Sequence, residues 1–280
     1  MATQQLMKDL IEAGIHFGHR VSRWNPKMAP YIFGKRNAIH IIDVRETLKG
    51  ILLARKFVTQ VVAGGKDALL VGTKRQARKA VEDNAMAVSM HYVSDRWLGG
   101  TLTNFHEIRK RVGRLDQLEQ LETDGMLDTY SKKEGSALRR EMRKVRRNLQ
   151  GIRRMTRLPG VLFIVDQHRE INAIREARKL GIPVVCLLDT DCDPDLVDIP
   201  IPGNDDAMRA IELVVGQITE AIAEGANTRS KLAIEGPAQE EPRRRSRRPT
   251  TARAQDEQAE QPAPQADAAP TGPADEAAQA

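Results

Sequence analysis

Apolar residues along the middle of the chain follow two alternating spacings. Short, nearly continuous apolar runs of the kind that fill buried strands stand at residues 68–72, 90–94, 160–166, 182–189 and 198–203. Apolar residues recur at helical spacing in the segments 43–65, 73–89, 169–181 and 204–225. Repeated strand–helix–strand units predict parallel strands with helices on both faces. The pattern therefore predicts an α/β fold, a doubly wound three-layer α/β/α arrangement with a mostly parallel sheet, flavodoxin-like or Rossmann-like.

The ends of the predicted helix over residues 43–65 are marked by particular residues. Asp43 is a good N-cap, and Gly64 and Gly65 can close the helix. Its apolar face comprises Val44, Leu48, Ile51, Leu52, Val58, Val61 and Val62. Thr73 is the expected N-cap of the next helix for the same reason.

One stretch, residues 104–157, carries no strand signal. Its second half has apolar residues spaced by 4, 3, 4 and 3 positions, as in a coiled-coil seam: Leu138, Met142, Val145, Leu149 and Ile152. Its first half has a less regular version: Ile108, Val112, Leu115, Leu118 and Leu121. The turn-rich segment 123–135 separates the halves. We predict two antiparallel helices that form a coiled-coil hairpin inserted into the α/β domain.

The inserted segment is also strongly basic. Residues 104–157 hold 15 Lys and Arg against 8 Asp and Glu, and the cations concentrate in residues 139–147. Such a run is either a solvated face or a face that binds phosphates, and the sequence leaves both interpretations open.

Composition narrows the kinds of partner. The 280 residues carry a formal net charge of +6, which favours an acidic partner, nucleic acid first and a membrane surface second. No apolar run approaches the roughly 20 residues that cross a bilayer, and the first residues lack an export signal. The two cysteines, Cys186 and Cys192, form no framework of pairs, so we expect a reducing cytoplasm.

The composition changes sharply near Gly225. Residues 226–280 are rich in Ala, Pro, Gln and charge, and such a segment cannot offset its ordering entropy by burial. Its basic part, 243–253, precedes an acidic part, so the tail is either solvated or contacts RNA through its basic half. We therefore predict three parts: an α/β domain with an N-terminal arm from residues 1–103 and 158–225, the hairpin 104–157, and a disordered basic-then-acidic tail 226–280.

The N-terminal arm interleaves aromatic residues with cations. Two runs, 31–33 and 38–42, flank the polar segment 34–37 and predict a small edge hairpin. The aromatic residues Phe17, Trp24, Tyr31 and Phe33 alternate with His19, Arg20, Arg23, Lys27, Lys35 and Arg36. Planar groups beside cations stack on unpaired bases and pair with phosphates, which favours an RNA contact. The alternative is an arm that packs its aromatic rings on the domain.

Two further segments carry candidate binding residues. Gly72, Thr73 and Lys74 follow a strand and begin a helix, which predicts an anion site, although the spacing is not that of a P-loop. Arg96 and Trp97 precede the inserted hairpin, where they either face a partner or form a rigid joint.

Carboxylates gather at predicted carboxyl ends of strands, where ligands bind in open parallel sheets. Asp189, Asp205 and Asp206 could converge there with a histidine of the arm and hold Mg²⁺ or Zn²⁺. Capping is the alternative, since Asn204 can cap the last helix and acidic residues favour its positive end. A flavodoxin-like or phosphatase enzyme would bind a small ligand at these loops, but no paired nucleophile and acid can be identified.

Five segments together resemble the family of the second protein of the bacterial small ribosomal subunit (the ribosomal protein S-two family). They are LIEAGIHFGHRVSRWNPKMAPYIFGKRNAIHIID, LLVGTKRQAR, RWLGGTLTNF, LPGVLFIVDQHREINAIREARKLGIPVVCLLDTDCDPD and IPGNDDAMRAI, and they cover residues 5–225 in order. The resemblance implies the α/β/α domain with a protruding coiled-coil hairpin, and no catalysis. It implies binding to small-subunit rRNA and to neighbouring ribosomal proteins, including the mRNA-binding first protein of that subunit. A divalent metal (Zn or Mg) would transfer to Asp189, Asp205 and Asp206, with His16 as a candidate further ligand.

The combined prediction is a structural rRNA-binding protein of the small subunit, cytoplasmic and in ribosomes. It needs no cofactor, no membrane and no small-molecule substrate. The residues expected to contact RNA are His19, Arg20, Arg23, Trp24, Lys27, Lys35, Arg36, Lys74, Arg75, Arg78, Arg96, Trp97, Arg109, Arg111, Arg139, Arg140, Arg143, Lys144, Arg146 and Arg147.

Overall fold

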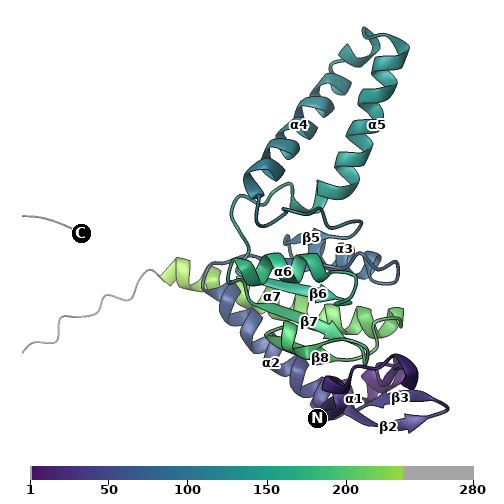
Figure 1. Ribbon diagram of the computed structural model, residues 1–280. Coiled ribbons are helices and arrows are strands. Elements are labelled where there is room, and N and C mark those ends of the chain that lie inside the picture. Colours follow the sequence, from purple (N-terminus) through teal and green to yellow (C-terminus); the bar gives the residue numbers. More distant parts are fainter. Residues whose placement is uncertain (1, 236–280) are drawn as a thin grey trace, which may run out of the picture. The chain divides into compact units, whose positions relative to one another are not determined.

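A five-stranded parallel sheet lies between helices in the computed structural model, which describes residues 2–235 (Figure 1). Its strands are β4 (Ala68–Val71), β5 (His91–Val93), β6 (Val161–Val165), β7 (Val184–Leu188) and β8 (Ile199–Pro202). The spatial order is β5-β4-β6-β7-β8, and every neighbouring pair is parallel. The five apolar runs form these strands because both faces of the sheet are covered. The predicted doubly wound fold is confirmed.

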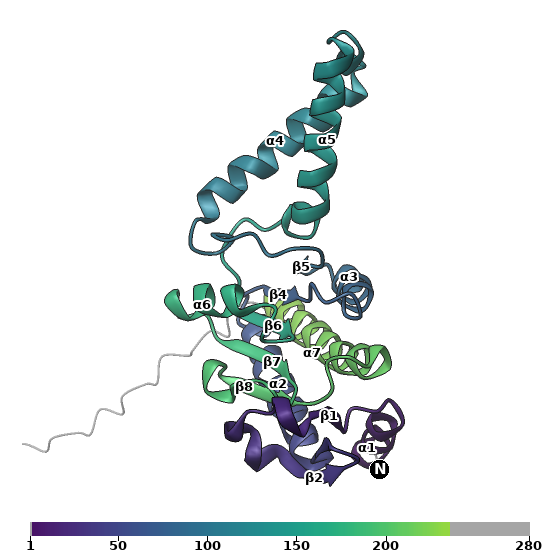
Figure 2. The same ribbon diagram turned by 45° about the vertical axis from the view of Figure 1, so that its right-hand side comes forward.

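Helices cover the two faces of the sheet in separate layers (Figures 1 and 2). The helices of one layer are α1 (Ala2–Glu12), α2 (Val44–Ala63), α3 (Arg78–Ala87) and α7 (Met208–Glu235). They pack on inward residues of the strands such as Phe163 and Leu187. The other face, which includes Leu162 and Ile164, packs against α6 (Ile171–Lys179) and the base of the hairpin. Within residues 2–235, none of the helices has the length and apolar character needed to cross a bilayer.

The N-terminal arm forms a small antiparallel sheet in the order β1-β3-β2. Its strands are β1 (Phe17–Arg20), β2 (Ile32–Arg36) and β3 (Ile39–Ile42), with 3-10 turns at Val21–Arg23 and Pro26–Tyr31. The β2–β3 pair is the predicted hairpin, and Asn37 and Ala38 turn it with positive φ angles of 50° and 58°. Strand β1 has no counterpart among the strands that the apolar pattern predicts.

The predicted coiled-coil hairpin is also present, as α4 (Phe105–Thr123) and α5 (Lys132–Leu149) (Figure 1). A 3-10 turn at Met126–Asp128 forms the tip, and another at Gln150–Ile152 follows α5. Leu115 and Leu118 of α4 pack with Met142 of α5 in a small core of their own. The spacing of apolar residues therefore identified the helices and the seam between them.

Three details of the sequence prediction are wrong. Helix α7 continues to Glu235, so residues 226–235 belong to a helix rather than to the tail, and residues 236–280 lie outside the described part. Helix α3 begins at Arg78 rather than at Lys74, because the Thr73 hydroxyl bonds to Glu170 instead of capping a helix. Leu52 is 47 % exposed and does not join the apolar face of α2.

Candidate nucleic-acid interface

A polar groove of about 620 Å³ lies where the base of the hairpin meets the α/β domain. We call it the basal groove. Residues from α3, the loop after β5, α5 and the start of α6 line it: Thr73, Arg78, Asp95, Arg96, Trp97, Lys144, Arg147, Asn148, Arg169, Glu170 and Asn172. Five of these side chains are cationic and two are acidic, so the groove carries excess positive charge.

The two carboxylates of the basal groove neutralise only part of this charge. Asp95 pairs with Arg78 at 2.6 Å and with Arg147 at 3.5 Å. Glu170 is buried beneath the Thr73 hydroxyl, and burial raises the pKa of its carboxyl. Arg96 and Lys144 are exposed and have no carboxylate partner among residues 2–235. These cations are therefore available to a phosphate backbone.

The basic surface continues along the hairpin. A second cavity of about 530 Å³ is lined by residues of α4, α5 and the loop before them, and it shares Arg96 and Lys144 with the basal groove. Arg111 and Arg114 extend it along α4, with Glu141 as its one acidic residue. Arg140 and Arg143 are exposed on α5, where Arg139 is half-buried. The α5 cations therefore lie mostly in solvent, as both the solvated and the phosphate-binding interpretations require.

The N-terminal arm presents cations next to exposed rings. Arg20, Arg23, Lys35 and Arg36 are exposed on β1, β2 and the turn between them. Phe33 is 71 % exposed, while the Trp24 ring lies 5.1 Å from the ring of His40. Lys27 differs from the other cations, because its ammonium contacts Asp193 at 2.8 Å and Asp195 at 2.7 Å.

Several predicted RNA-contacting residues have partners within the protein. Trp97 is 8 % exposed and donates its indole N–H to Glu176, so it is the rigid joint rather than a stacking platform. Arg109 donates to the backbone carbonyls of Arg153 and Met155, which fixes the exit of the hairpin. Arg146 pairs with Glu119 at 2.7 Å across the hairpin.

Lys74 and His19 lie in a cluster of carboxylates at the carboxyl edge of the sheet. Lys74 Nζ lies 2.7 Å from Asp205 Oδ1 and 2.7 Å from Asp206 Oδ1. His19 Nδ1 lies 2.9 Å from Asp189 Oδ2. Arg75, by contrast, is exposed beside Lys74. Lys74 follows β4, whereas Asp189 follows β7 and Asp205 and Asp206 follow β8, so the cluster joins the carboxyl ends of several strands.

The charged groups of this cluster shift one another's pKa values. The Asp189 carboxylate raises the pKa of His19 to about 9, so the imidazole is cationic at neutral pH. Burial and the charge of Asp166 raise the pKa of Asp205 to about 7 against the opposing effect of Lys74. Although burial opposes its charge, the carboxylates Asp205, Asp206 and Asp166 raise the pKa of Lys74. Two cations thus face four carboxyl groups within the site.

This balance bears on the predicted divalent metal. The donor atoms of His19, Asp205 and Asp206 lie within 4.8 Å of one another, but the Lys74 ammonium already contacts both carboxylates. A divalent ion at these carboxylates would have to displace the Lys74 ammonium from Asp205 and Asp206. The histidine of the cluster is His19, whereas His16 contacts the Phe17 ring and does not join it. A metal at Asp189, Asp205 and Asp206 stays a prediction.

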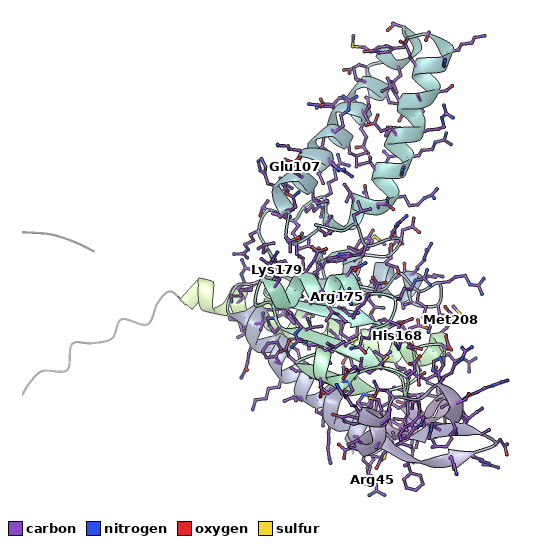
Figure 3. All side chains as sticks on the ribbon, in the orientation of Figure 1. Arg45, Glu107, His168, Arg175, Lys179 and Met208 are labelled. Atoms are coloured by element: carbon purple, nitrogen blue, oxygen red, sulfur yellow. The ribbon has the colours of Figure 1, made fainter. Side chains whose placement is uncertain are left out.

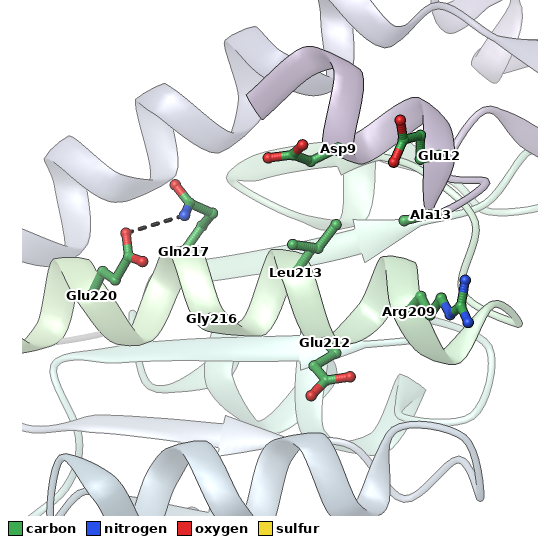
Figure 4. A pocket seen from close by; sticks show the side chains of 9 residues that line it. All are labelled: Asp9, Glu12, Ala13, Arg209, Glu212, Leu213, Gly216, Gln217 and Glu220. Carbon is green, nitrogen blue, oxygen red and sulfur yellow. Dashed lines mark hydrogen bonds between the residues drawn. The ribbon is translucent and has the colours of Figure 1, made fainter. Parts of the chain in front are cut away.

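An acidic groove of about 470 Å³ lies between α1 and α7, along the layer that carries α2 (Figure 4). Its lining includes the small or apolar residues Ala13, Leu213 and Gly216. It also includes four carboxylates, of Asp9, Glu12, Glu212 and Glu220, and one guanidinium, of Arg209; Arg55 pairs with Glu220 at 3.3 Å. The lining therefore carries excess negative charge.

Sequence reasoning missed Arg169 and Glu170 of the basal groove. Both lie in the segment between strand β6 and helix α6, and residues at the carboxyl ends of parallel strands converge at one edge of a sheet. That rule, applied to the segment after residue 166 as it was to Asp189 and Asp205, would have found them.

Comparisons with known proteins agree on one family. A family model described as ribosomal protein S2 matches residues 10–225. The chain is 57 % identical over 221 residues to a small ribosomal subunit protein uS2 of Rhodopirellula baltica, which covers 79 % of this chain and 85 % of that protein. It is 53 % identical over 219 residues to the uS2 protein of Synechocystis, covering 78 % of this chain and 81 % of that protein. A uS2c protein of Porphyra purpurea is 51 % identical over 78 % of this chain and 91 % of its own length.

Proposed function

This chain belongs to the ribosomal protein S2 family, a family of structural, non-enzymatic proteins of the small ribosomal subunit, and from that premise we propose how it is held there. We propose that the basal groove and the cationic faces of the hairpin and the arm bind the backbone of small-subunit rRNA. The protein would thus reside in ribosomes in the cytoplasm and support translation by its placement.

The observation that carries this proposal is the unneutralised charge of the basal groove. Arg96 and Lys144 approach the groove from two different elements, the loop after β5 and helix α5, and have no acidic partner among residues 2–235. Two unpaired cations from different elements suit a phosphodiester that runs along the groove. Helix cations contact phosphates rather than base edges, so affinity should depend strongly on salt and weakly on sequence.

We propose that protein partners bind elsewhere on the chain. The acidic groove between α1 and α7 supports contact with a cationic segment of a neighbouring small-subunit protein, because its four carboxylates would repel RNA. The mRNA-binding first protein of the subunit is the partner that the sequence resemblance implies. The α/β domain and the hairpin would then contact different partners.

Charge reversal on the basic face tests the RNA proposal. The triple variant Arg96→Glu, Arg143→Glu, Lys144→Glu changes exposed side chains without breaking the Arg146–Glu119 pair of the hairpin. We expect this variant to fold and to be lost from small subunits washed in moderate salt, as measured by quantitative mass spectrometry of sedimented particles.

The matched control reverses three exposed lysines on the other layer, in the variant Lys8→Glu, Lys56→Glu, Lys231→Glu, which changes the net charge equally. This control should remain in the particles. Equal retention of both variants would show that the basic face is only solvated.

A further inference from the structure

Three different metal-ligating side chains, none of them a member of the Lys74 cluster, meet on two loops at the carboxyl edge of the sheet. His168 follows β6 and lies at this edge (Figure 3), and Asp191 and Cys192 follow β7. Each residue offers one donor atom: an imidazole nitrogen, a carboxylate oxygen and a sulfur. These three atoms lie within 4.8 Å of one another. We propose that His168, Asp191 and Cys192 form a zinc site that ties the β6–α6 loop to the loop after β7.

Two distances within this triad, each to a different oxygen of Asp191, are close to the spacing of zinc ligands. His168 Nε2 lies 3.7 Å from Asp191 Oδ2, and Cys192 Sγ lies 3.5 Å from Asp191 Oδ1. Zinc bonds to nitrogen, oxygen and sulfur of roughly 2.0–2.3 Å place ligand atoms of a tetrahedron about 3.3–3.6 Å apart. Ligation needs only a small movement of the imidazole, which exchanges its 3.0 Å contact with the Asp191 carbonyl for the ion.

A buried amide holds the two loops in register. Gln167 is 2 % exposed, accepts a hydrogen bond from the Asp193 backbone N–H at 2.6 Å and donates one to the Asp193 carbonyl at 2.6 Å. Gln167 directly precedes His168, and Asp193 directly follows Cys192. The clamp therefore fixes the backbone on both sides of the triad, which lowers the ordering cost of binding an ion.

The environment of Cys192 favours the protonated thiol, so an ion must displace a proton to bind its sulfur. The Cys192 side chain is fully buried, and burial together with the Asp191 charge raises the pKa of its thiol. Zinc must therefore displace the thiol proton, which leaves to solvent as the Zn–S bond forms. The exposed side of His168 gives solvent access, so a water completes the fourth position. No ammonium is paired with this triad among residues 2–235, unlike the carboxylates around Lys74.

Cobalt substitution tests this site directly, because a Co²⁺–thiolate bond absorbs in the near ultraviolet and carboxylates do not produce that band. The chain has two cysteines, so the band can arise only from Cys186 or Cys192. We expect the full-length reduced protein, titrated with Co²⁺, to show the thiolate band at one equivalent and to lose it when Zn²⁺ is added. Cys192→Ser should abolish the band, and His168→Ala should weaken Co²⁺ binding by about tenfold or more.

Two control variants separate this site from its alternatives. Cys186→Ser removes the other buried thiol, and Asp206→Asn alters the Lys74 cluster; both should keep the band. Far-ultraviolet circular dichroism confirms that each variant is folded. Absence of a thiolate band from the folded wild-type protein, or its persistence in folded Cys192→Ser, would overturn the proposal. Because none of these readouts involves RNA, the result is independent of the proposed ribosomal contacts.

Discussion

The indole N–H of Trp97 donates to the Glu176 carboxylate of α6 at 3.0 Å, and this bond joins the root of the hairpin to the α/β domain. The same carboxylate accepts backbone N–H groups of Gly100, Leu102 and Thr103. The Thr103 hydroxyl donates to it as well, so one acidic side chain accepts five hydrogen bonds from the loop that leads into α4. Although its burial acts in the opposite direction, these hydrogen bonds lower the pKa of Glu176.

Replacing Glu176 with Ala should loosen the root of the hairpin. Several partly buried N–H groups would lose their acceptor, so we expect the free energy of unfolding to fall by about 2–3 kcal/mol. Urea titration followed by the fluorescence of Trp97 and Trp24 measures this change. Glu122→Ala, at an exposed position of α4, is the control and should leave stability within about 0.5 kcal/mol. A loss of the same small size at both positions would contradict the anchoring role.

Replacing Lys74 with Met should destabilise the carboxylate cluster. The ammonium is the counter-ion of Asp205, whose side chain is 4 % exposed, and its removal leaves buried like charges unpaired. We expect a loss on the order of 3 kcal/mol in chemical denaturation at pH 7.5, partly restored by adding Asp205→Asn. Arg75→Met, at the neighbouring exposed position, is the matched control. If adding Asp205→Asn to Lys74→Met lowers the free energy of unfolding further, Asp205 is not the carboxylate that Lys74 neutralises.

The raised pKa of His19 predicts a particular dependence of stability on pH. Protonated His19 stabilises the folded state because its pKa is higher in that state than in the unfolded chain. This contribution is fully present below the unfolded pKa near 6.5 and is lost as the pH rises through the folded pKa of about 9. We expect the free energy of unfolding to fall by about 1–2 kcal/mol between pH 7.5 and 9.5, a window that lies above the pKa of Asp205.

The variant His19→Gln should flatten this dependence, whereas His106→Gln on the exposed part of α4 should not. Titration of the His19 ring by NMR measures the pKa itself. An observed value near 6.5 would show that the contact with Asp189 does not hold the proton.

The sequence predicted the parts of the fold that depend on local patterns. Continuous apolar runs located all five parallel strands, and the 4, 3, 4, 3 spacing located α5. Asp43 caps α2 as expected, since its carboxylate accepts the N–H of Arg45. These features need only residues that are close along the chain.

The direction of a side chain depends on residues that are far away along the chain. Thr73 does not cap a helix because its hydroxyl donates a hydrogen bond to Glu170, 97 positions later. The Lys74 side chain points toward Asp205 rather than into solvent. Trp97 is buried because it packs in the core at the base of the hairpin and donates its indole N–H to Glu176. A sequence pattern shows that such a residue carries charge or a ring, but tertiary contacts decide whether a partner can reach it.

The salt dependence of RNA binding should reveal which of the remaining cations contact phosphates. Each lysine or arginine that contacts a phosphate releases condensed counterions, so neutralising it lowers the slope of log K against log salt by about one unit. We expect Arg96→Gln with Lys144→Gln to lower the slope by about two units for a small-subunit rRNA fragment, measured by filter binding over a salt series. Lys56→Gln with Lys8→Gln, on the opposite layer, should leave it unchanged. A uniform loss of affinity at every salt concentration would instead mean that the basal groove changed shape without losing a phosphate contact.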